Sequence, residues 1–357
     1  MAATTETVAS RLEWPDFARG ASIVMVVLLH LFLLHYIYFF YGFPGSDVVN
    51  AVVDATLPLR MPLFFLVSGY LASRAIQRPW RAVLRPRMLL LVYVYLVWVV
   101  VNAVFDVLRE RFCHGGPVDV PRFLLDNLIW PQTTLWYLYA LLLFFVAARL
   151  TRRVPLPALL AVAIVLSVLG TTFLDGLPQH LLRSFVFYLV AARAPQLIDL
   201  LLRRSGWIVT TVTGLVAVAS TALYVATFAD LGLFLAAGVA SVAFALQLSV
   251  RVAAHPLAAP VRYLGRHTLA IFLVHPFVFI VANDALLARP GAAEWMRDHD
   301  LVVIAYPWLL LAATLAVCVG VEALARRIGL AWLFSLPLTG TARSRGASTS
   351  RGTSTSG

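Results

Sequence analysis

The sequence contains repeated apolar runs of roughly 18 to 24 residues, separated by turns that hold charged residues, proline or glycine. Runs of this length can cross a bilayer as helices, which satisfy their backbone polar groups within one segment. Of the 357 residues, 61% are hydrophobic and only 13% are charged. The sequence therefore predicts an all-α polytopic membrane protein with about ten transmembrane helices. The candidate spans are 20–41, 50–73, 88–108, 132–149, 155–174, 178–195, 206–228, 230–250, 267–288 and 301–325.

The basic residues indicate how these spans are oriented. The chain has 28 basic residues, all of them arginine, and a formal net charge of +11. Cytoplasmic loops hold the excess of positive charge in membrane proteins, and most of the arginines fall on one side when the N-terminus is placed inside. We therefore expect two cytoplasmic termini and a multi-pass protein of the plasma membrane. Because the arginines are divided among short loops, topology explains the charge, and no nucleic-acid partner is expected.

Composition divides the chain into three parts. Residues 1–15 are expected to form a cytoplasmic N-terminal segment, and residues 16–335 a membrane-embedded domain. Residues 336–357 are rich in Ser, Thr, Gly and Arg and cannot bury a core, so we expect a disordered cytoplasmic tail. Cys113 lies in an outer loop and Cys318 inside the last span, so we expect no disulfide between them and no thiolate metal site.

The first span contains the most informative pair of ionisable residues, Arg19 and His30. An eleven-residue step returns to within roughly 20° of the same helix face and rises roughly 16 Å. Arg19 is therefore predicted at the membrane surface and His30 near the middle of the bilayer, on one face. His35 lies about 140° around the helix from that face. An ionisable side chain inside a membrane predicts a functional site.

The second span carries a buried arginine between two prolines. Pro58 and Pro62 remove helix hydrogen bonds on either side of Arg60, and broken helices at membrane depth occur where they line a cavity or are buried in protein. Arg60 is expected either to face a polar cavity, or to reach the outer interface or pair with Asp54 as a structural contact. Ser68 near the inner end is a candidate nucleophile, although a packing contact is the favoured explanation for a small residue at this position.

Two further features point to substrate contacts. The loop Arg78-Pro-Trp-Arg81 presents two guanidinium groups beside a tryptophan, which suits the phosphates and the adenine ring of a nucleotide-like cofactor. His275 in the ninth span lies at a depth similar to that of His30. The two histidines either share an active-site cavity, or His275 has a hydrogen-bonded structural role.

Several familiar catalytic signatures are missing from the sequence. It has no His-Glu-x-x-His zinc motif, no Gly-x-Ser-x-Gly elbow and no glycine-rich phosphate loop. Any chemistry must therefore come from isolated ionisable groups on different helices, and no metal or permanently bound cofactor is predicted.

These pieces, in this order, resemble the acyltransferase 3 family, whose members are integral-membrane acyltransferases that decorate cell-envelope sugars. The similarity extends over residues 11–335. It is closest to the branch of fucose-4-O-acetylase-like enzymes, in which a histidine commonly precedes Met-Pro where this chain has Arg60. The matching positions are Arg19 and His30 in RLEWPDFARGASIVMVVLLH, Phe65, Ser68 and Gly69 in MPLFFLVSGYL, Arg78 and Arg81, Trp136 in LWYLYALL, and His275 in LGRHTLAIFLVHPF.

The resemblance implies an acyl-CoA donor, with acetyl-CoA expected, and a hydroxyl acceptor on an envelope glycan or glycolipid. His30 would deprotonate that hydroxyl, in keeping with imidazole chemistry near pH 7, or would carry the acyl group covalently. Arg19 would orient the donor. The remaining expected contacts are Arg78, Arg81 and Arg85 with the CoA phosphates, and Arg60, Ser68 and His275 with the substrates, with Arg60 either stabilising an oxyanion or binding the acceptor.

Two other classes of protein fit part of this pattern. A transporter or flippase of a lipid-linked or small anionic solute would also place ionisable groups along a pathway through the membrane. The two halves of the sequence show no convincing internal repeat, which many transporter folds have. A structural or partner-binding membrane protein would leave the buried ionisable groups without a purpose.

Overall fold

The computed structural model describes residues 2–83, 88–111, 119–131, 133–227 and 232–337. These ranges are almost entirely helical and contain no strand, which confirms the all-α prediction for the described part of the chain. Cys113, Arg85 and most of the predicted tail lie outside the described residues. The division into an N-terminal segment, a membrane domain and a tail stays a prediction.

The chain forms seventeen α-helices within the described residues, with a π-helical turn after the first. Their bounds are α1 Ala2–Leu31, the π-turn Phe32–Tyr36, α2 Ile37–Phe40, α3 Ser46–Ala55, α4 Leu57–Gln77, α5 Trp80–Val83, α6 Leu89–Arg109, α7 Val120–Ile129, α8 Trp136–Leu150, α9 Leu156–Phe173, α10 Gly176–Arg193, α11 Pro195–Arg203, α12 Trp207–Thr227, α13 Leu233–Val252, α14 Ala259–Arg266, α15 Thr268–Leu287, α16 Pro290–Arg297 and α17 Asp300–Arg327.

Eight helical stretches in the described ranges are long and apolar enough to cross a membrane, and a ninth results if α10 and α11, bent by 81°, form one span. The first two are Glu13–Phe40, which combines α1 from Glu13 onwards with the π-turn and α2, and Ser46–Gln77, which includes α3 and α4. The predicted run 132–149 is α8, whose 15 residues fall short of the roughly 20 that a spanning helix needs. The count of ten and the cytoplasmic position of the termini stay predictions.

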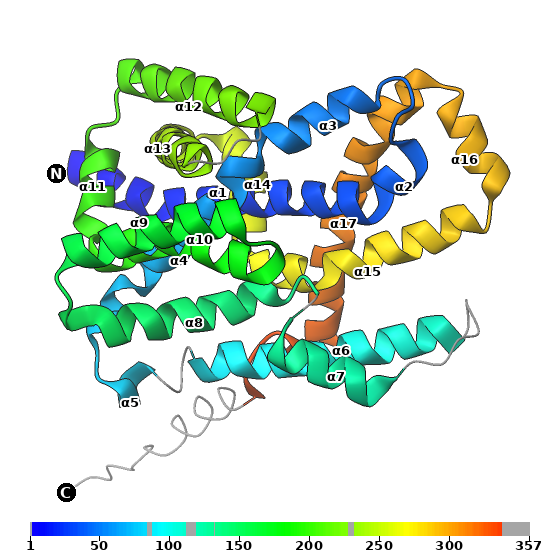
Figure 1. Ribbon diagram of the computed structural model, residues 1–357, viewed down its shortest axis with the longest axis horizontal. Helices are drawn as coiled ribbons and strands as arrows, with labels where there is room; N and C mark the ends of the chain where they lie inside the picture. The colour runs from blue at the N-terminus through cyan, green and yellow to red at the C-terminus, as the bar shows by residue number, and fades with distance from the viewer. Residues whose placement is uncertain (1, 84–87, 112–118, 132, 228–231, 338–357) are drawn as a thin grey trace, which may run out of the picture.

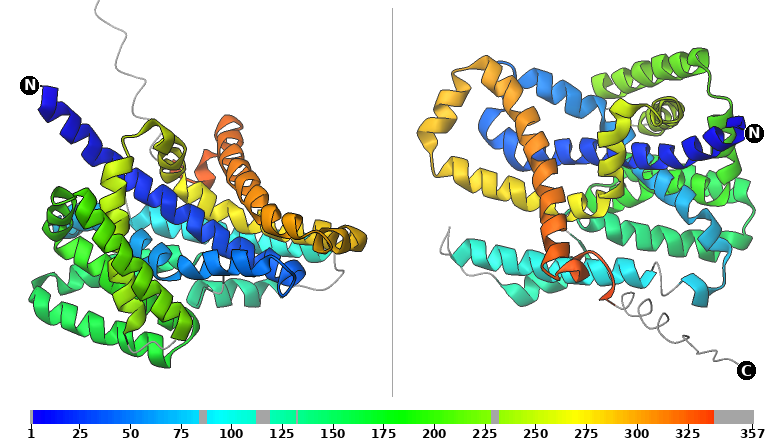
Figure 2. Two further views of the ribbon diagram at one scale, coloured as in Figure 1. Left: turned by 90° about the horizontal axis from the view of Figure 1, so that it is seen from above. Right: turned by 180° about the vertical axis from the view of Figure 1, so that it is seen from behind.

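Helix α1 crosses the middle of the molecule (Figures 1 and 2). It packs against α4, α13, α14 and α15, with α12 and α13 on one side of it and α6, α7 and α8 on the other in the view of Figure 1. Ile23, Val27 and Leu31 are fully buried, and their spacing of four residues makes them one continuous apolar stripe. The candidate site residues on α1 are therefore surrounded by other helices.

The second span breaks where the prolines predicted an interruption. Helix α3 ends at Ala55 and α4 begins at Leu57, so that Pro58 occupies the first turn of α4, where its missing N–H leaves no bond unmade. Pro62 stays inside α4. The break leaves backbone carbonyl groups at the end of α3 available to a side chain.

Helix α1 and the short helix α14 approach so closely that only glycine fits at the crossing. A Cβ atom at Gly20 would collide with the carbonyl oxygen of Val261, and a Cβ atom at Gly265 with the carbonyl oxygen of Asp16. Two ion pairs flank the crossing, from Arg266 to Asp16 at 3.3 Å and from Arg262 to Glu13 at 3.9 Å. This contact fixes α1 against the beginning of α15 and so positions Arg19.

We predict that Gly265→Val destabilises the protein more than Gly320→Val does. Valine at 265 must push α1 away from α14, and overpacking of this kind costs about 1–3 kcal/mol or more, whereas a Cβ atom at Gly320 meets open space. The measurement is the thermal midpoint and the monodisperse fraction of each variant after detergent extraction. Equal midpoints for the two variants would contradict the close crossing.

Candidate active site

Two histidines that are far apart in the sequence meet inside the helix bundle. His30 on α1 and His275 on α15 lie with Nδ1 of His30 3.0 Å from Nε2 of His275, and their ring centroids are 5.0 Å apart. His275 is fully buried, and its Nδ1 lies 2.9 Å from the carbonyl oxygen of Ile271. This contact agrees with the expectation that both histidines reach the same depth.

The hydrogen bonds assign the protons of the two neutral rings. The carbonyl oxygen of Ile271 can only accept, so Nδ1 of His275 donates to it and Nε2 of His275 carries a lone pair. That lone pair accepts a hydrogen bond from Nδ1–H of His30. Nε2 of His30 is therefore left unprotonated. His275 thus holds His30 in the tautomer that a general base requires.

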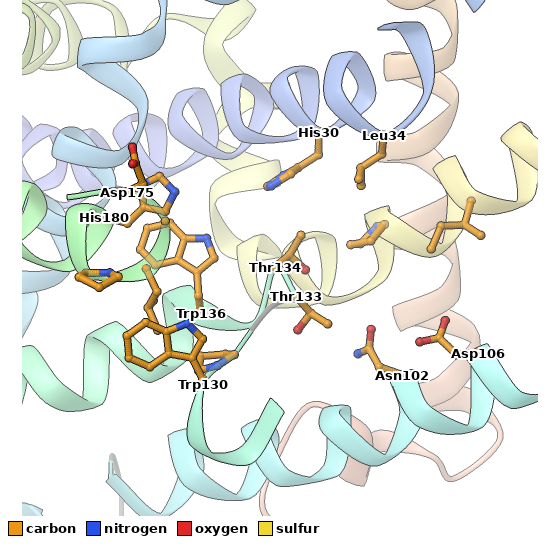
Figure 3. A pocket seen from close by; sticks show the side chains of 16 residues that line it. His30, Leu34, Asn102, Asp106, Trp130, Thr133, Thr134, Trp136, Asp175 and His180 are labelled. Carbon is orange, nitrogen blue, oxygen red and sulfur yellow. The ribbon is translucent and has the colours of Figure 1, made fainter. Parts of the chain in front are cut away.

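His30 lines a cavity of about 490 Å³ that we call the His30 cavity. Figure 3 shows the His30 side chain extending from α1 into the space between α6, α8 and α10. The polar and aromatic lining suits a ligand that has hydroxyl groups and an apolar face. The lining residues are His30, Leu34, Asn102, Asp106, Trp130, Pro131, Thr133, Thr134, Trp136, Asp175, Gly176, Leu177, Pro178, His180, Pro276 and Ile280.

Arg19 lines a separate cavity of about 320 Å³, which we call the Arg19 cavity. Its guanidinium Nη2 donates a hydrogen bond of 2.8 Å to Oγ1 of Thr268, the first residue of α15. The lining is mostly leucine and phenylalanine, with four polar side chains among them. The lining residues are Arg19, Phe64, Ser68, Leu71, Leu91, Tyr137, Leu138, Leu141, Thr268, Leu269 and Phe272.

The two cavities follow one another along four shared helices, α1, α6, α8 and α15. On α15 the Arg19 cavity ends at Phe272 and the His30 cavity begins at Pro276, one helical turn or roughly 6 Å further on. On α8, Tyr137 lines the first cavity and Trp136 the second. The ring of Phe272 lies 5.2 Å from that of Tyr137. A thin aromatic layer beside the two histidines therefore separates the cavities.

Ser68 has a defined hydrogen-bond role in the Arg19 cavity. Its Oγ donates 2.8 Å to the carbonyl oxygen of Phe64, so the hydroxyl of Tyr137, 2.9 Å away, donates to Ser68. The hydroxyl proton of Ser68 is directed to the backbone, and no histidine or carboxylate contacts it among the described residues. This arrangement does not activate Ser68 as a nucleophile.

Arg60 lies inside the protein at the break between α3 and α4. Its side chain is buried, and Nη1 donates to the carbonyl oxygen of Val53 at 3.2 Å and to Oγ1 of Thr56 at 3.4 Å. It does not line the His30 cavity. In the described residues it forms no ion pair with Asp54. Arg60 therefore connects the two halves of the broken span.

The structure describes two of the three arginines that were predicted to bind phosphate, Arg78 and Arg81. Arg78 and Arg81 are exposed on either side of Trp80, on the loop and short helix α5 that follow α4. Arg85 lies outside the described residues, so the structure gives no position for it.

His35 lies on a different face from Arg19 and His30, as the helix periodicity predicted. The π-turn directs it towards α15 and α17, where Nδ1 lies 3.1 Å from Oδ1 of Asn283 and Nε2 lies 2.7 Å from the hydroxyl of Tyr306. The side chain is fully buried. Because both ring nitrogens are bonded, His35 joins helices and has no free nitrogen for catalysis.

Sequence reasoning missed several residues of the His30 cavity. His180, whose ring lies 5.1 Å from that of Trp136, and Trp130 come from loops and helix ends. Asn102 and Asp106 both line the cavity from α6. Their spacing of four residues within an apolar span was a usable signal, because it puts two polar side chains on one face of a membrane helix.

We predict that diethyl pyrocarbonate, which modifies accessible unprotonated imidazole nitrogens, acylates His30 much faster than His275 or His35. His30 borders a cavity and has a free Nε2, whereas His275 and His35 are both fully buried. The measurement is peptide mass spectrometry of the treated protein in nanodiscs, with the exposed His255 and His299 as internal references. Modification of His275 at the rate of His30 would contradict the proton assignment and the burial.

Comparisons with known proteins show the family of the chain. The family model described as an acyltransferase domain, Acyl_transf_3, matches residues 12–323. The inner membrane protein YcfT of Escherichia coli (strain K12) is 27% identical over 350 residues, which cover 91% of this chain and 96% of that protein. No solved structure matches the chain. The chain therefore belongs to the acyltransferase 3 family and is a multi-pass protein of the cell membrane.

Proposed function

We propose that this membrane acyltransferase moves an acyl group, in the first instance acetyl, from acyl-CoA to a hydroxyl group of a cell-envelope sugar, glycolipid or polysaccharide. The observation that carries the proposal is the contact of 3.0 Å between Nδ1 of His30 and Nε2 of His275, which leaves Nε2 of His30 unprotonated at the edge of a cavity that has polar side chains. A base at that position can accept the proton of an acceptor hydroxyl. The predicted orientation would open the Arg19 cavity towards the cytoplasm, where acyl-CoA is found.

In the proposed reaction, the acceptor hydroxyl lies in the His30 cavity and gives its proton to Nε2 of His30. The hydroxyl oxygen attacks the thioester carbonyl carbon, the C–O bond forms, and the tetrahedral intermediate collapses as the C–S bond breaks. The leaving thiolate takes the proton back from the imidazolium ring. The hydrogen bond from Nδ1–H of His30 to His275 keeps the ring oriented throughout.

Arg19 has a different role in this scheme. It stands eleven residues before His30 on α1, which corresponds to roughly 16 Å of helix rise. Arg19 therefore contacts the arm of the donor in its own cavity and orients it, while the thioester reaches His30 at the layer between Tyr137 and Phe272. Arg60 supports α3 and α4 around the site. A covalent acyl group on Nε2 of His30 uses the same lone pair, and acid-quenched protein analysed by mass spectrometry separates the two routes.

We predict that His30→Ala lowers acyl transfer at least about 100-fold, the usual contribution of a general base, with normal membrane insertion. The control is His255→Ala, since that histidine is exposed. The assay follows radiolabelled acetyl-CoA with purified protein, together with mass spectrometry of envelope glycans and glycolipids from a deletion strain that carries each variant. Near wild-type turnover by His30→Ala would exclude this mechanism.

We predict that His275→Gln retains far more activity than His275→Leu. The glutamine carbonyl oxygen can accept the hydrogen bond from Nδ1–H of His30, whereas leucine fills the space without an acceptor and leaves the tautomer of His30 unspecified. The measurement is kcat for acetyl transfer over a range of pH, with thermal midpoints to confirm that both variants fold. Equal kcat values would assign His275 a packing role only.

A further inference from the structure

A small cavity of about 200 Å³ is lined by three arginines at the C-terminal end of α8, which is the end away from His30 and His275. It is lined by Trp80, Arg149, Leu150, Arg152 and Arg153. These residues come from α5, from the end of α8 and from the 3₁₀ turn Thr151–Arg153 that leads to α9. We call it the arginine cavity. In Figure 1, α5 and the end of α8 lie at the same side of the molecule as the start of α1.

Arg149 is built into this cavity with a buried donor unused. Its side chain is 3% exposed, and its guanidinium carbon lies 4.4 Å from the centre of the Trp80 ring. Nη1 donates 2.6 Å to the carbonyl oxygen of Ile76 in the last turn of α4. Its buried Nε has no hydrogen-bond partner. A buried donor without a partner is costly, so this N–H is suited to an acceptor that the protein does not supply.

The turn that carries Arg152 and Arg153 is held rigidly by another arginine. Arg193 donates from Nη1 to the carbonyl oxygen of Thr151 at 2.7 Å and from Nη2 to that of Val154 at 3.0 Å. The side chains of Arg152 and Arg153 are exposed and have no carboxylate partner among the described residues. The positive charge is therefore fixed in place but not neutralised by the protein.

Orientation in the membrane explains why arginines occur in this turn, but it does not explain the convergence of two loops or the unused Nε of Arg149. Guanidinium groups beside an aromatic ring bind phosphate groups through paired, charge-assisted hydrogen bonds. No carboxylate lines the cavity. Its chemistry fits a phosphomonoester or a diphosphate.

The arginine cavity lies in line with the Arg19 cavity. Leu141 on α8 lines the Arg19 cavity and Arg149 stands eight residues further on, which corresponds to roughly 12 Å. On α4, which packs against α8, Leu71 also lines the Arg19 cavity, and Trp80 follows nine residues later, just beyond the end of α4 at Gln77. A long, extended thioester donor that has its phosphates at one end would follow this direction.

We propose that the arginine cavity binds the phosphate groups of the acyl donor, with Arg152 and Arg153 as its main contacts. The phosphate site would thus include the turn between α8 and α9 as well as the loop with Arg78 and Arg81. This inference rests on the proposed function, because it takes acyl-CoA as the donor. The phosphates would then anchor the donor while its thioester end extends through the Arg19 cavity towards His30.

The test compares Arg152→Ala/Arg153→Ala with Arg203→Ala/Arg204→Ala in the full-length protein in neutral-lipid nanodiscs. Arg203 and Arg204 are also adjacent and exposed, so both double variants lose the same charge. Equilibrium binding is measured with coenzyme A, with adenosine 3′,5′-bisphosphate and with pantetheine. We expect the first double variant to weaken binding of the two phosphate-bearing probes about tenfold or more, with pantetheine binding unchanged and the second double variant like wild type.

Two further experiments are needed. One distinguishes the effect of charge from that of hydrogen-bond geometry, and the other distinguishes binding of coenzyme A from binding of lipid headgroups. Arg152→Lys/Arg153→Lys keeps the charge that orients the chain but loses paired hydrogen bonding, and it should bind coenzyme A with intermediate affinity. Nanodiscs that contain anionic phospholipid report lipid binding. If the alanine variant loses anionic lipid but binds coenzyme A like wild type, the cavity holds lipid headgroups and the proposal is wrong.

Turnover distinguishes failure of this inference from failure of the proposed function. With acetyl-CoA the alanine variant should show a raised KM and nearly unchanged kcat, and an acetyl thioester without phosphates should react equally with both proteins. If wild type transfers acetyl groups and the alanine variant has the same KM for acetyl-CoA, the arginine cavity is not the phosphate site. If wild type neither binds coenzyme A nor cleaves acetyl-CoA, the proposed function fails and this inference fails with it.

Discussion

A polar side chain buried between these helices is costly unless it finds a hydrogen-bond partner inside the protein, because neither hydrocarbon nor a packed apolar core supplies one. The pairing of His30 with His275 satisfies this requirement for α1 and α15. His35 does the same for α1, α15 and α17 through Asn283 and Tyr306. These bonds connect the central helix to its neighbours and, at His30, leave the lone pair of Nε2 unused. The hydrogen bond that satisfies the buried His30 ring thus also determines which of its nitrogens is unprotonated.

The two cavities of the site differ in the side chains that line them. The Arg19 cavity is mostly apolar and includes one cation, whereas the His30 cavity has more polar side chains and contains tryptophan rings. Between them lies a single turn of α15 with the aromatic contact of Phe272 and Tyr137. A transporter needs a continuous pathway that opens alternately to each side. Two neighbouring cavities of different character, one of which is lined by His30, suit two substrates that exchange a group, in agreement with membership of an acyltransferase family.

Several features of the site followed from the sequence because they depend on local geometry. Helix periodicity placed Arg19 and His30 on one face, and it removed His35 from that face. The depth of His275 followed from its position in the ninth run. By contrast, the partners of Arg60 could not be predicted, because the break at Thr56 exposes a carbonyl group that periodicity does not reveal. The burial of Arg149 could not be predicted either, because it depends on contact with Trp80 from a different loop.

The sequence by itself determined that the chain is an all-helical membrane protein, because long apolar runs can satisfy their backbone in lipid only as helices. It also indicated which ionisable residues share a face of α1. Only the tertiary structure decided that His275 contacts His30 and which nitrogen of each ring carries the proton. The same is true of the groups that complete the His30 cavity and of the turn that brings Arg152 and Arg153 to Trp80. These depend on how separate helices pack, and hydrophobic periodicity specifies which face of a helix is buried but not which neighbour it meets.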